Sequence, residues 1–138
     1  EILFKDRLDV EVFQADAQRI YLMNGRPLLV ETSGNIYPTL KFDEYFSQAP
    51  RVVVDMGAVP YVVNGADIMA PGIRSASEGI KVGDLVLVVD ERHSKGLAMG
   101  ILLMDREEIL QKKKGKALKN VHYVGDEIWN ASKNIIKR

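Results

Sequence analysis

The chain has 138 residues, of which 46% are hydrophobic and 28% are charged, the balance of a soluble globular protein. Its 19 basic residues match 19 acidic ones, so the net charge does not indicate a nucleic-acid partner. No apolar run approaches the roughly 20 residues that cross a bilayer, and the absence of cysteine excludes disulfides, thiolate metal sites and a cysteine nucleophile.

The first predicted elements are β-strands. Leu8, Val10 and Val12 alternate with acidic residues, which is the period-two pattern of a half-buried strand. Two apolar runs then flank Asn24 and Gly25. A type I′ turn needs positive φ at both central residues, and this pair tolerates it. The sequence therefore predicts an antiparallel hairpin centred on this turn.

A short helix closes the first third of the chain. Residues 40–46 predict it, with Leu40, Tyr45 and Phe46 facing inward. Pro50 ends the segment, because the residue before a proline is pushed out of the α region. We place a domain boundary here and expect an N-terminal domain over residues 1–50.

Beyond the boundary, short apolar runs alternate with loops. Residues 51–54 predict a buried strand, and residues 58–63 predict a second one. Residues 64–73 contain two glycines and a proline, which is too many for a long helix. They predict one tight helical turn between two loops.

The rest of the chain adds further strands and a helix. A turn at residues 81–84 leads into a strand over residues 85–89, and a polar loop connects it to a strand over residues 97–104. Asp105 has the position of an N-cap with Glu108 three residues later, which predicts a helix to about residue 111.

The last predicted strand covers residues 120–124. Asp126 follows it and predicts a short capped turn that contains Trp129. We expect residues 131–138 to form a C-terminal tail.

Together these elements predict a mixed α+β fold that is mainly β, with a small β-rich N-terminal domain packed on a small β-barrel. The strands are short and separated by tight turns, and the helices stand at the margins. No strand–helix–strand alternation is present, which excludes a doubly wound α/β fold.

Several motifs in the second half resemble the PUA domain, in this order. VNGADIMAPGI (residues 63–73), preceded by VDMGA (54–58), is similar to the signature of that family. KVGDLVLVVDE (81–91), GLAMGILLM (96–104) and GKALKNVHYVGDEIW (115–129) resemble its later elements. The resemblance implies an RNA-binding pseudo-barrel without catalytic chemistry over residues 51–130.

The attached N-terminal segment is too short for a known catalytic partner of this domain. Tyr37-Pro-Thr-Leu40 and the short apolar helix after it resemble the family of the malignant T-cell-amplified sequence protein and its archaeal relatives. The resemblance implies a translation initiation and recycling factor that contacts the small ribosomal subunit, binds the tRNA acceptor end and pairs with a partner like density-regulated protein. It also implies a leading helix, which the sequence from Glu1 does not show.

The signature segment supplies the first candidate RNA-binding residues. Gly65 and Ala66 are small enough for a nucleic-acid backbone to approach, and the start of a helical turn offers N–H groups to a phosphate. Ile68, Met69 and Ile73 are candidates to contact an unstacked base. The alternative is a glycine-rich barrel corner with Ile68 and Ile73 in the core. The full candidate set is Asn64, Gly65, Ala66, Asp67, Ile68, Met69, Pro71, Gly72 and Ile73.

A lysine cluster supplies the second candidate set. Residues 105–138 carry 9 basic against 5 acidic residues. The excess lies in Lys112, Lys113, Lys114, Lys116 and Lys119, which form a possible phosphate-facing patch. The alternative is a solvated helix end, which lysines favour through the helix dipole.

The two histidines lie in different settings. His93 lies in a polar loop, where solvent exposure is expected. His122 lies on the closing strand, where it could stack on RNA or be a satisfied histidine of the barrel surface.

No motif indicates catalysis. HExxH, Cys/His clusters and phosphate-cradling GxxxxGK[ST] sequences are absent. Asp55, Asp67, Asp84 and Asp90 lie near turns, where aspartate commonly caps backbone N–H groups. We therefore expect a cytoplasmic, non-enzymatic protein with no cofactor, no metal, no signal peptide and no membrane partner.

Three functions remain open at this point. The first is a translation factor that binds tRNA or rRNA together with the small ribosomal subunit. The second is an accessory RNA-recognition subunit of a tRNA or rRNA modification enzyme, because residues 115–129 also resemble the PUA domain of archaeosine transglycosylase. The third is a protein-interaction module whose exposed apolar residues bind a partner chain.

Overall fold

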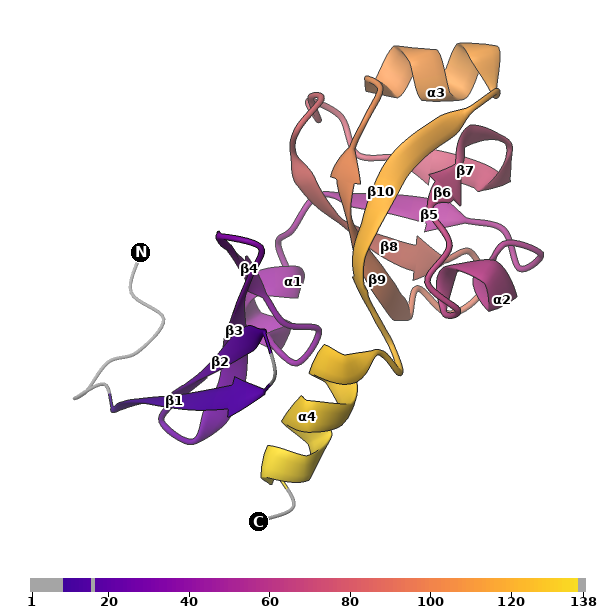
Figure 1. The fold of residues 1–138 in the computed structure, drawn as a ribbon. Helices are drawn as coiled ribbons and strands as arrows, with labels where there is room; N and C mark the ends of the chain where they lie inside the picture. Colours follow the sequence, from indigo (N-terminus) through magenta and orange to yellow (C-terminus); the bar gives the residue numbers. More distant parts are fainter. Residues whose placement is uncertain (1–8, 16, 137–138) are drawn as a thin grey trace. The chain divides into compact units, whose positions relative to one another are not determined.

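A computed structural model describes residues 9–15 and 17–136 (Figure 1). Leu8 and residues 137–138, for which a strand and a tail were expected, lie outside the described residues. The chain divides into two compact units. The first contains the residues up to Ser47 and those from Asp126 onward, and the second contains Gln48–Gly125. The final helix, α4 (Glu127–Ile136), runs through residue 130 and belongs to the first unit.

The first unit is an antiparallel sheet in the order β1-β2-β3-β4. Its strands are β1 (Val10–Ala15), β2 (Gln18–Met23), β3 (Arg26–Thr32) and β4 (Asn35–Pro38). The hairpin prediction is confirmed, because Asn24 (φ 53°) and Gly25 (φ 81°) connect β2 to β3 with positive φ. The short helix is confirmed as α1 (Asp43–Phe46).

The burial expected for β1 is wrong. Val10 and Val12 are 51% and 57% exposed, whereas Phe13 packs against the small core of Ile20, Val30 and Ile128. Both faces of this edge strand carry apolar residues, so alternation alone does not tell which face is covered.

The final helix is longer than the short turn that was expected. Asp126 accepts the N–H of Trp129 (2.7 Å), as predicted for a cap, but α4 continues for ten residues. It contacts β2 and β3, and Ile128 is buried. Lys41 lies 3.8 Å from the centroid of the Trp129 ring and adds a cation–π contact.

The second unit is a six-stranded sheet in the order β6-β10-β9-β8-β5-β7, which curls in Figure 1. The strands are β5 (Arg51–Val54), β6 (Ile68–Met69), β7 (Ile73–Ala76), β8 (Leu85–Asp90), β9 (Gly96–Leu102) and β10 (Lys116–Tyr123). Only β5 and β8 pair in parallel among the described strands. The fold is therefore mainly β, as predicted.

One element of the second unit was predicted wrongly. Residues 58–63 were expected as a strand, but Val59–Val62 forms the helix α2. Its β-branched, apolar composition favours a strand. Pro60 nevertheless fits the first turn of a helix, where its missing N–H leaves no intrahelical bond unmade.

The tight helical turn and the second helix are confirmed. A 3₁₀ turn, η1, covers Ala70–Gly72. Helix α3 (Arg106–Lys112) begins with the predicted capping box, in which Asp105 accepts the N–H of Glu108 at 2.8 Å. It contacts β7 and η1.

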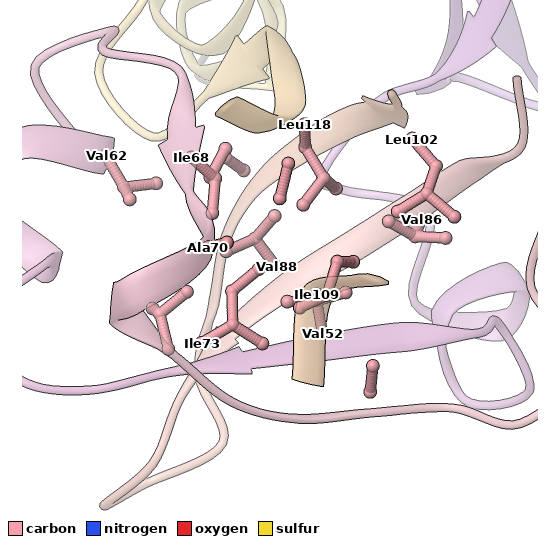
Figure 2. Packing of buried hydrophobic residues seen from close by; sticks show 14 of the residues in the cluster. Val52, Val62, Ile68, Ala70, Ile73, Val86, Val88, Leu102, Ile109 and Leu118 are labelled. Atoms are coloured by element: carbon pink, nitrogen blue, oxygen red, sulfur yellow. The ribbon is translucent and has the colours of Figure 1, made fainter. Parts of the chain in front are cut away.

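The core of this unit lies inside the curled sheet (Figure 2). Side chains from strands far apart in the sequence meet there, among them Val52, Val88 and Leu118. Ile109 of α3 and Val62 of α2 are buried in the same cluster. This packing fixes the positions of α2 and η1, which carry the candidate site.

Candidate nucleic-acid interface

A surface groove lies beside α2, β6 and η1. Its volume is about 310 Å³. Five of the predicted residues line it: Ala66, Asp67, Ile68, Met69 and Gly72. Five residues that were not predicted complete the lining: Asp55, Gly57, Ala58, Tyr61 and Val62. The last three fall in residues 58–63, which were predicted as a buried strand although Pro60 signals a helix start.

Two large side chains of the groove, the aromatic Tyr61 and the flexible Met69, are exposed to solvent. Tyr61 is 69% exposed and Met69 is 48% exposed. Large apolar side chains at the surface of a concave site can receive the face of an unstacked base. Tyr61 is therefore the strongest stacking candidate among the described residues of the groove.

Ile68 and Ile73 do not offer the exposed surface that was one reading of the sequence. They are 2% and 3% exposed and belong to the core cluster (Figure 2). Ile68 lies on β6 next to Met69, and neighbouring strand residues point to opposite sides. The burial of Ile68 thus accompanies the exposure of Met69. The alternative prediction, in which Ile68 and Ile73 belong to the core of the barrel, is correct.

The glycines allow close packing around the groove. Gly65 has φ 94°, and an added Cβ would lie 3.1 Å from the ring and hydroxyl of Tyr123. An added Cβ on Gly72 would lie 3.2 Å from the Cβ of Ala58, so α2 and η1 are close together. Asn64, next to Gly65, and Pro71, next to Gly72, are both exposed.

The start of η1 does not offer the phosphate donor that was expected. The Ala70 N–H donates to the carbonyl of Gly115 at 2.8 Å. That donor is used within the fold and is not available to a phosphate.

Asp67 is held by two partners. Lys116 Nζ lies 2.9 Å from Asp67 Oδ2, and the Asn120 N–H donates to Asp67 Oδ1 at 2.8 Å. The bond from Lys116, followed by that from Asn120, lowers the pKa of Asp67 below its usual value. The carboxylate therefore stays ionised, and its charge is balanced by Lys116.

The lysine cluster borders the groove. Lys116 pairs in register with Met69, and Gly115 accepts from Ala70, so the loop after α3 runs along β6 and η1. All five lysines, Lys112, Lys113, Lys114, Lys116 and Lys119, are exposed. Lys112 lies 3.7 Å from Glu108, an i,i+4 pair on α3. Of the five lysines, Lys116 is therefore the one that the strand register places beside the groove.

The histidine on the closing strand is not at the surface. His122 is 1% exposed, so the expectation of a barrel-surface residue is wrong. The register of β10 against β9 shifts between Asn120 and His122, and such an irregularity changes which face a side chain takes. His93 is exposed, as expected.

The four turn aspartates cap backbone N–H groups. Asp55 accepts from Ala58, Asp84 from Lys81, and Asp90 from the N–H groups of Arg92, His93 and Lys95. Asp67 accepts from Asn120 in the same way. In the part of the chain that the structure describes, no group of three or more His, Cys, Asp or Glu side chains could hold a metal ion. No described helix is long and apolar enough to cross a membrane.

Family models match both parts of the chain. Residues 50–124 match the PUA domain. Residues 4–43 match a domain of unknown function, DUF1947.

Relatives with similar sequences come from archaea and eukaryotes. An uncharacterized protein of Methanocaldococcus jannaschii is 46% identical over 123 residues, which are 88% of this chain and 76% of that protein. Translation machinery-associated protein 20 of Saccharomyces cerevisiae is 36% identical, over 85% of this chain and 68% of its own length. Malignant T-cell-amplified sequence 1 of Rattus norvegicus is 33% identical, over 80% of this chain and 64% of its own length.

Solved structures share the fold. A hypothetical protein of Pyrococcus horikoshii has a TM-score of 0.80 at 41% identity, covering 91% of this chain and 80% of that one. A conserved PUA domain protein of Thermoplasma acidophilum has a TM-score of 0.76 at 31% identity, covering 88% and 80%. A chain of an H/ACA RNP bound to a substrate RNA has a TM-score of 0.57 at 32% identity, covering 68% of this chain and 28% of that one. The PUA match over the second unit and these identities show that the chain belongs to the PUA domain proteins, in the family of translation machinery-associated protein 20 and malignant T-cell-amplified sequence 1.

Proposed function

We propose that the chain is a non-catalytic, translation-related RNA-binding protein that uses the groove beside α2 and the adjoining lysines. The observation that carries this proposal is the exposed Tyr61 in an apolar groove bordered by Lys116 and the loop before it. A base stacks on an aromatic face, and lysines neutralise the phosphates next to it. Single-stranded RNA ends fit this combination, because their bases are free to leave the stack.

The translation setting rests on the relatives. Translation machinery-associated protein 20 is named for the translation machinery, and its similarity covers 85% of this chain. We propose that the RNA is a tRNA acceptor end or rRNA. We also propose that the protein acts on the small ribosomal subunit in the cytoplasm, with or without a partner like density-regulated protein.

Binding to a tRNA-like 3′ end tests the site. We expect a fluorescently labelled hairpin with a single-stranded 3′ tail to bind in an anisotropy titration, and a blunt hairpin to bind more weakly. Tyr61→Ala should lower the affinity for the tailed RNA about fivefold or more, since stacking of one base on an aromatic side chain contributes ~1–3 kcal/mol. Val82→Ala is the matched control, because Val82 is also exposed (59%) but does not line the groove.

Two results would contradict the proposal. The first is equal binding of the tailed RNA by the Tyr61→Ala variant and the wild-type protein. The second is no binding to tRNA or to small ribosomal subunits at low salt, where the phosphate contribution is largest.

An accessory role in RNA modification is the second candidate. It is favoured by the 32% identity over 68% of this chain with a chain of the H/ACA RNP. Affinity capture from a native extract distinguishes the two candidates. Small-subunit proteins and rRNA in the eluate support the translation role, whereas a stoichiometric RNA-modification enzyme supports the second.

A further inference from the structure

We infer that Asn120 is a positioning residue that holds the groove in its binding shape without contacting the RNA. This inference rests on the proposed function only for its RNA-binding consequence. The structural part concerns three groove residues, Val62, Ala66 and Asp67, which all hydrogen-bond to Asn120. Asn120 itself does not line the groove.

Asn120 of β10 hydrogen-bonds to three residues between the end of α2 and the start of β6. Its Nδ2 donates to the carbonyls of Val62 and Ala66, both at 3.0 Å. Its backbone N–H donates to Asp67 Oδ1 at 2.8 Å. Strand β10 is therefore tied to the end of α2, to the following loop and to the entry of β6 through a single residue.

The amide orientation is fixed by these contacts. Both bonds from the side chain end on carbonyl oxygens, which accept and never donate, so the nitrogen must face them. The side-chain nitrogen of Asn120 therefore serves as the donor to both the end of α2 and the loop that follows it.

The path of β10 places Asn120 where it reaches the loop. Asn120 pairs with Gly100 of β9, and the register shifts immediately after it. A Cβ on Gly100 would lie 2.9 Å from Leu118 Cδ2 and 3.2 Å from the carbonyl of Lys119. The glycine therefore allows β10 to lie unusually close to β9 beside the irregularity.

The loop has few other anchors. Within it, the N–H groups of Asn64 and Ala66 donate to the Tyr61 carbonyl and that of Gly65 donates to the Val62 carbonyl, all local bonds. The Lys116–Asp67 ion pair also ties this segment to β10, beside the ladder of β6. Loss of the Asn120 bonds should therefore open the loop and move Tyr61 and Ala66 out of place.

Asn120→Ser is the sharpest test, because it loses the double donation without placing a charge against the carbonyls of Val62 and Ala66. Hydrogen exchange followed by NMR reports on the loop directly. The Ala66 and Gly65 N–H groups should exchange at least tenfold faster in the variant. The Gly83 N–H, which donates to Leu102 in another part of the unit, should keep its rate. Asn35→Ser, at the exposed first residue of β4, is the matched control and should change neither rate.

RNA affinity gives the functional arm. Asn120→Ser should bind the tailed RNA at least tenfold more weakly while the slope of log affinity against log salt stays as in the wild type, because no charge is added or removed. Lys119→Gln should instead reduce that slope. If Asn120→Ser does not fold, Asn120→Ala, which loses both donations, is measured in the same way.

The outcomes separate the two proposals. Unchanged exchange at Ala66 and Gly65, or faster exchange that includes Gly83 equally, would overturn the positioning role. Faster loop exchange with unchanged RNA affinity would overturn its RNA-binding consequence. A wild-type protein that binds no RNA would instead remove the proposed function, while the exchange measurement would still decide the role of Asn120.

Discussion

The two units bury their apolar residues to very different extents. The second unit encloses a large core in which Val52, Val88 and Leu118 are fully buried (Figure 2). The first unit has a smaller core around Ile20 and Val30. Hydrophobic stabilisation scales with the apolar area removed from water. The second unit should therefore be the more robust scaffold.

A core truncation in the second unit should have the largest effect. Leu118→Ala removes a fully buried side chain from β10, and such changes cost ~2–5 kcal/mol of unfolding free energy. Urea denaturation followed by circular dichroism measures it. Val10→Ala in the first unit, at an exposed position, should cost less than ~0.5 kcal/mol. Similar losses for both variants would contradict the difference between the units.

Two glycines with positive φ, one in each unit, allow a second comparison of how tightly the units pack. Gly65→Ala should destabilise the protein by about 1–3 kcal/mol, because it adds steric conflict with Tyr123 to the unfavourable backbone conformation. Gly25 has φ 81°, but nothing lies within 4 Å of an added Cβ. Gly25→Ala should therefore cost only the ~1–2 kcal/mol of placing an alanine in the left-handed conformation. Thermal unfolding of both variants checks the order, and a larger loss for Gly25→Ala would refute the packing argument.

The smallest effect is expected for an exposed ion pair in the first unit. Arg26 donates to Glu44 through Nη1 at 2.5 Å and Nη2 at 2.8 Å, and this lowers the pKa of Glu44 from 4.5 to about 2. A carboxyl whose pKa is lower in the folded state stabilises the fold above its unfolded pKa. Its contribution is therefore full above about pH 4.5 and disappears as the pH falls towards 2.

Glu44→Gln tests this pH dependence. Between pH 4.5 and pH 2 the unfolding free energy of the variant should fall slightly less than that of the wild type. The difference is small because exposed ion pairs contribute little. Glu107→Gln, at an exposed carboxyl of α3, is the control. An identical pH profile for the wild type and the Glu44→Gln variant would show that the ion pair contributes nothing.

Local patterns predicted much of the fold. The Asn24-Gly25 turn, the strands β5, β8 and β9, and the Asp105–Glu108 capping box follow from backbone preferences within a few residues. Helix α2 was not predicted, because its β-branched composition favours a strand and outweighed the helix-start signal of Pro60.

The candidate site was predicted in part for the same reason. The segment of residues 64–73 was identified from its glycines and small residues, but the directions of Ile68 and Met69 depend on the pairing of β6 with β10. The lysines were visible as composition, whereas their adjacency to the groove comes from the Met69–Lys116 register. Tyr61 and Asn120 carried no sequence signal of their own. Their roles arise from contacts between residues up to 58 positions apart.

The assignment of α4 to the first unit has a consequence for the order in which the chain folds. The second unit is one continuous stretch of sequence, Gln48–Gly125. In the sequence it separates the two segments that make up the first unit. Domains generally fold as units while the chain emerges from the ribosome. The second unit has all of its strands once Tyr123 has emerged, but the sheet of the first unit waits for Ile128 to complete its core. The RNA-binding unit is therefore expected to mature first, although the β1–β4 sheet is synthesised before it.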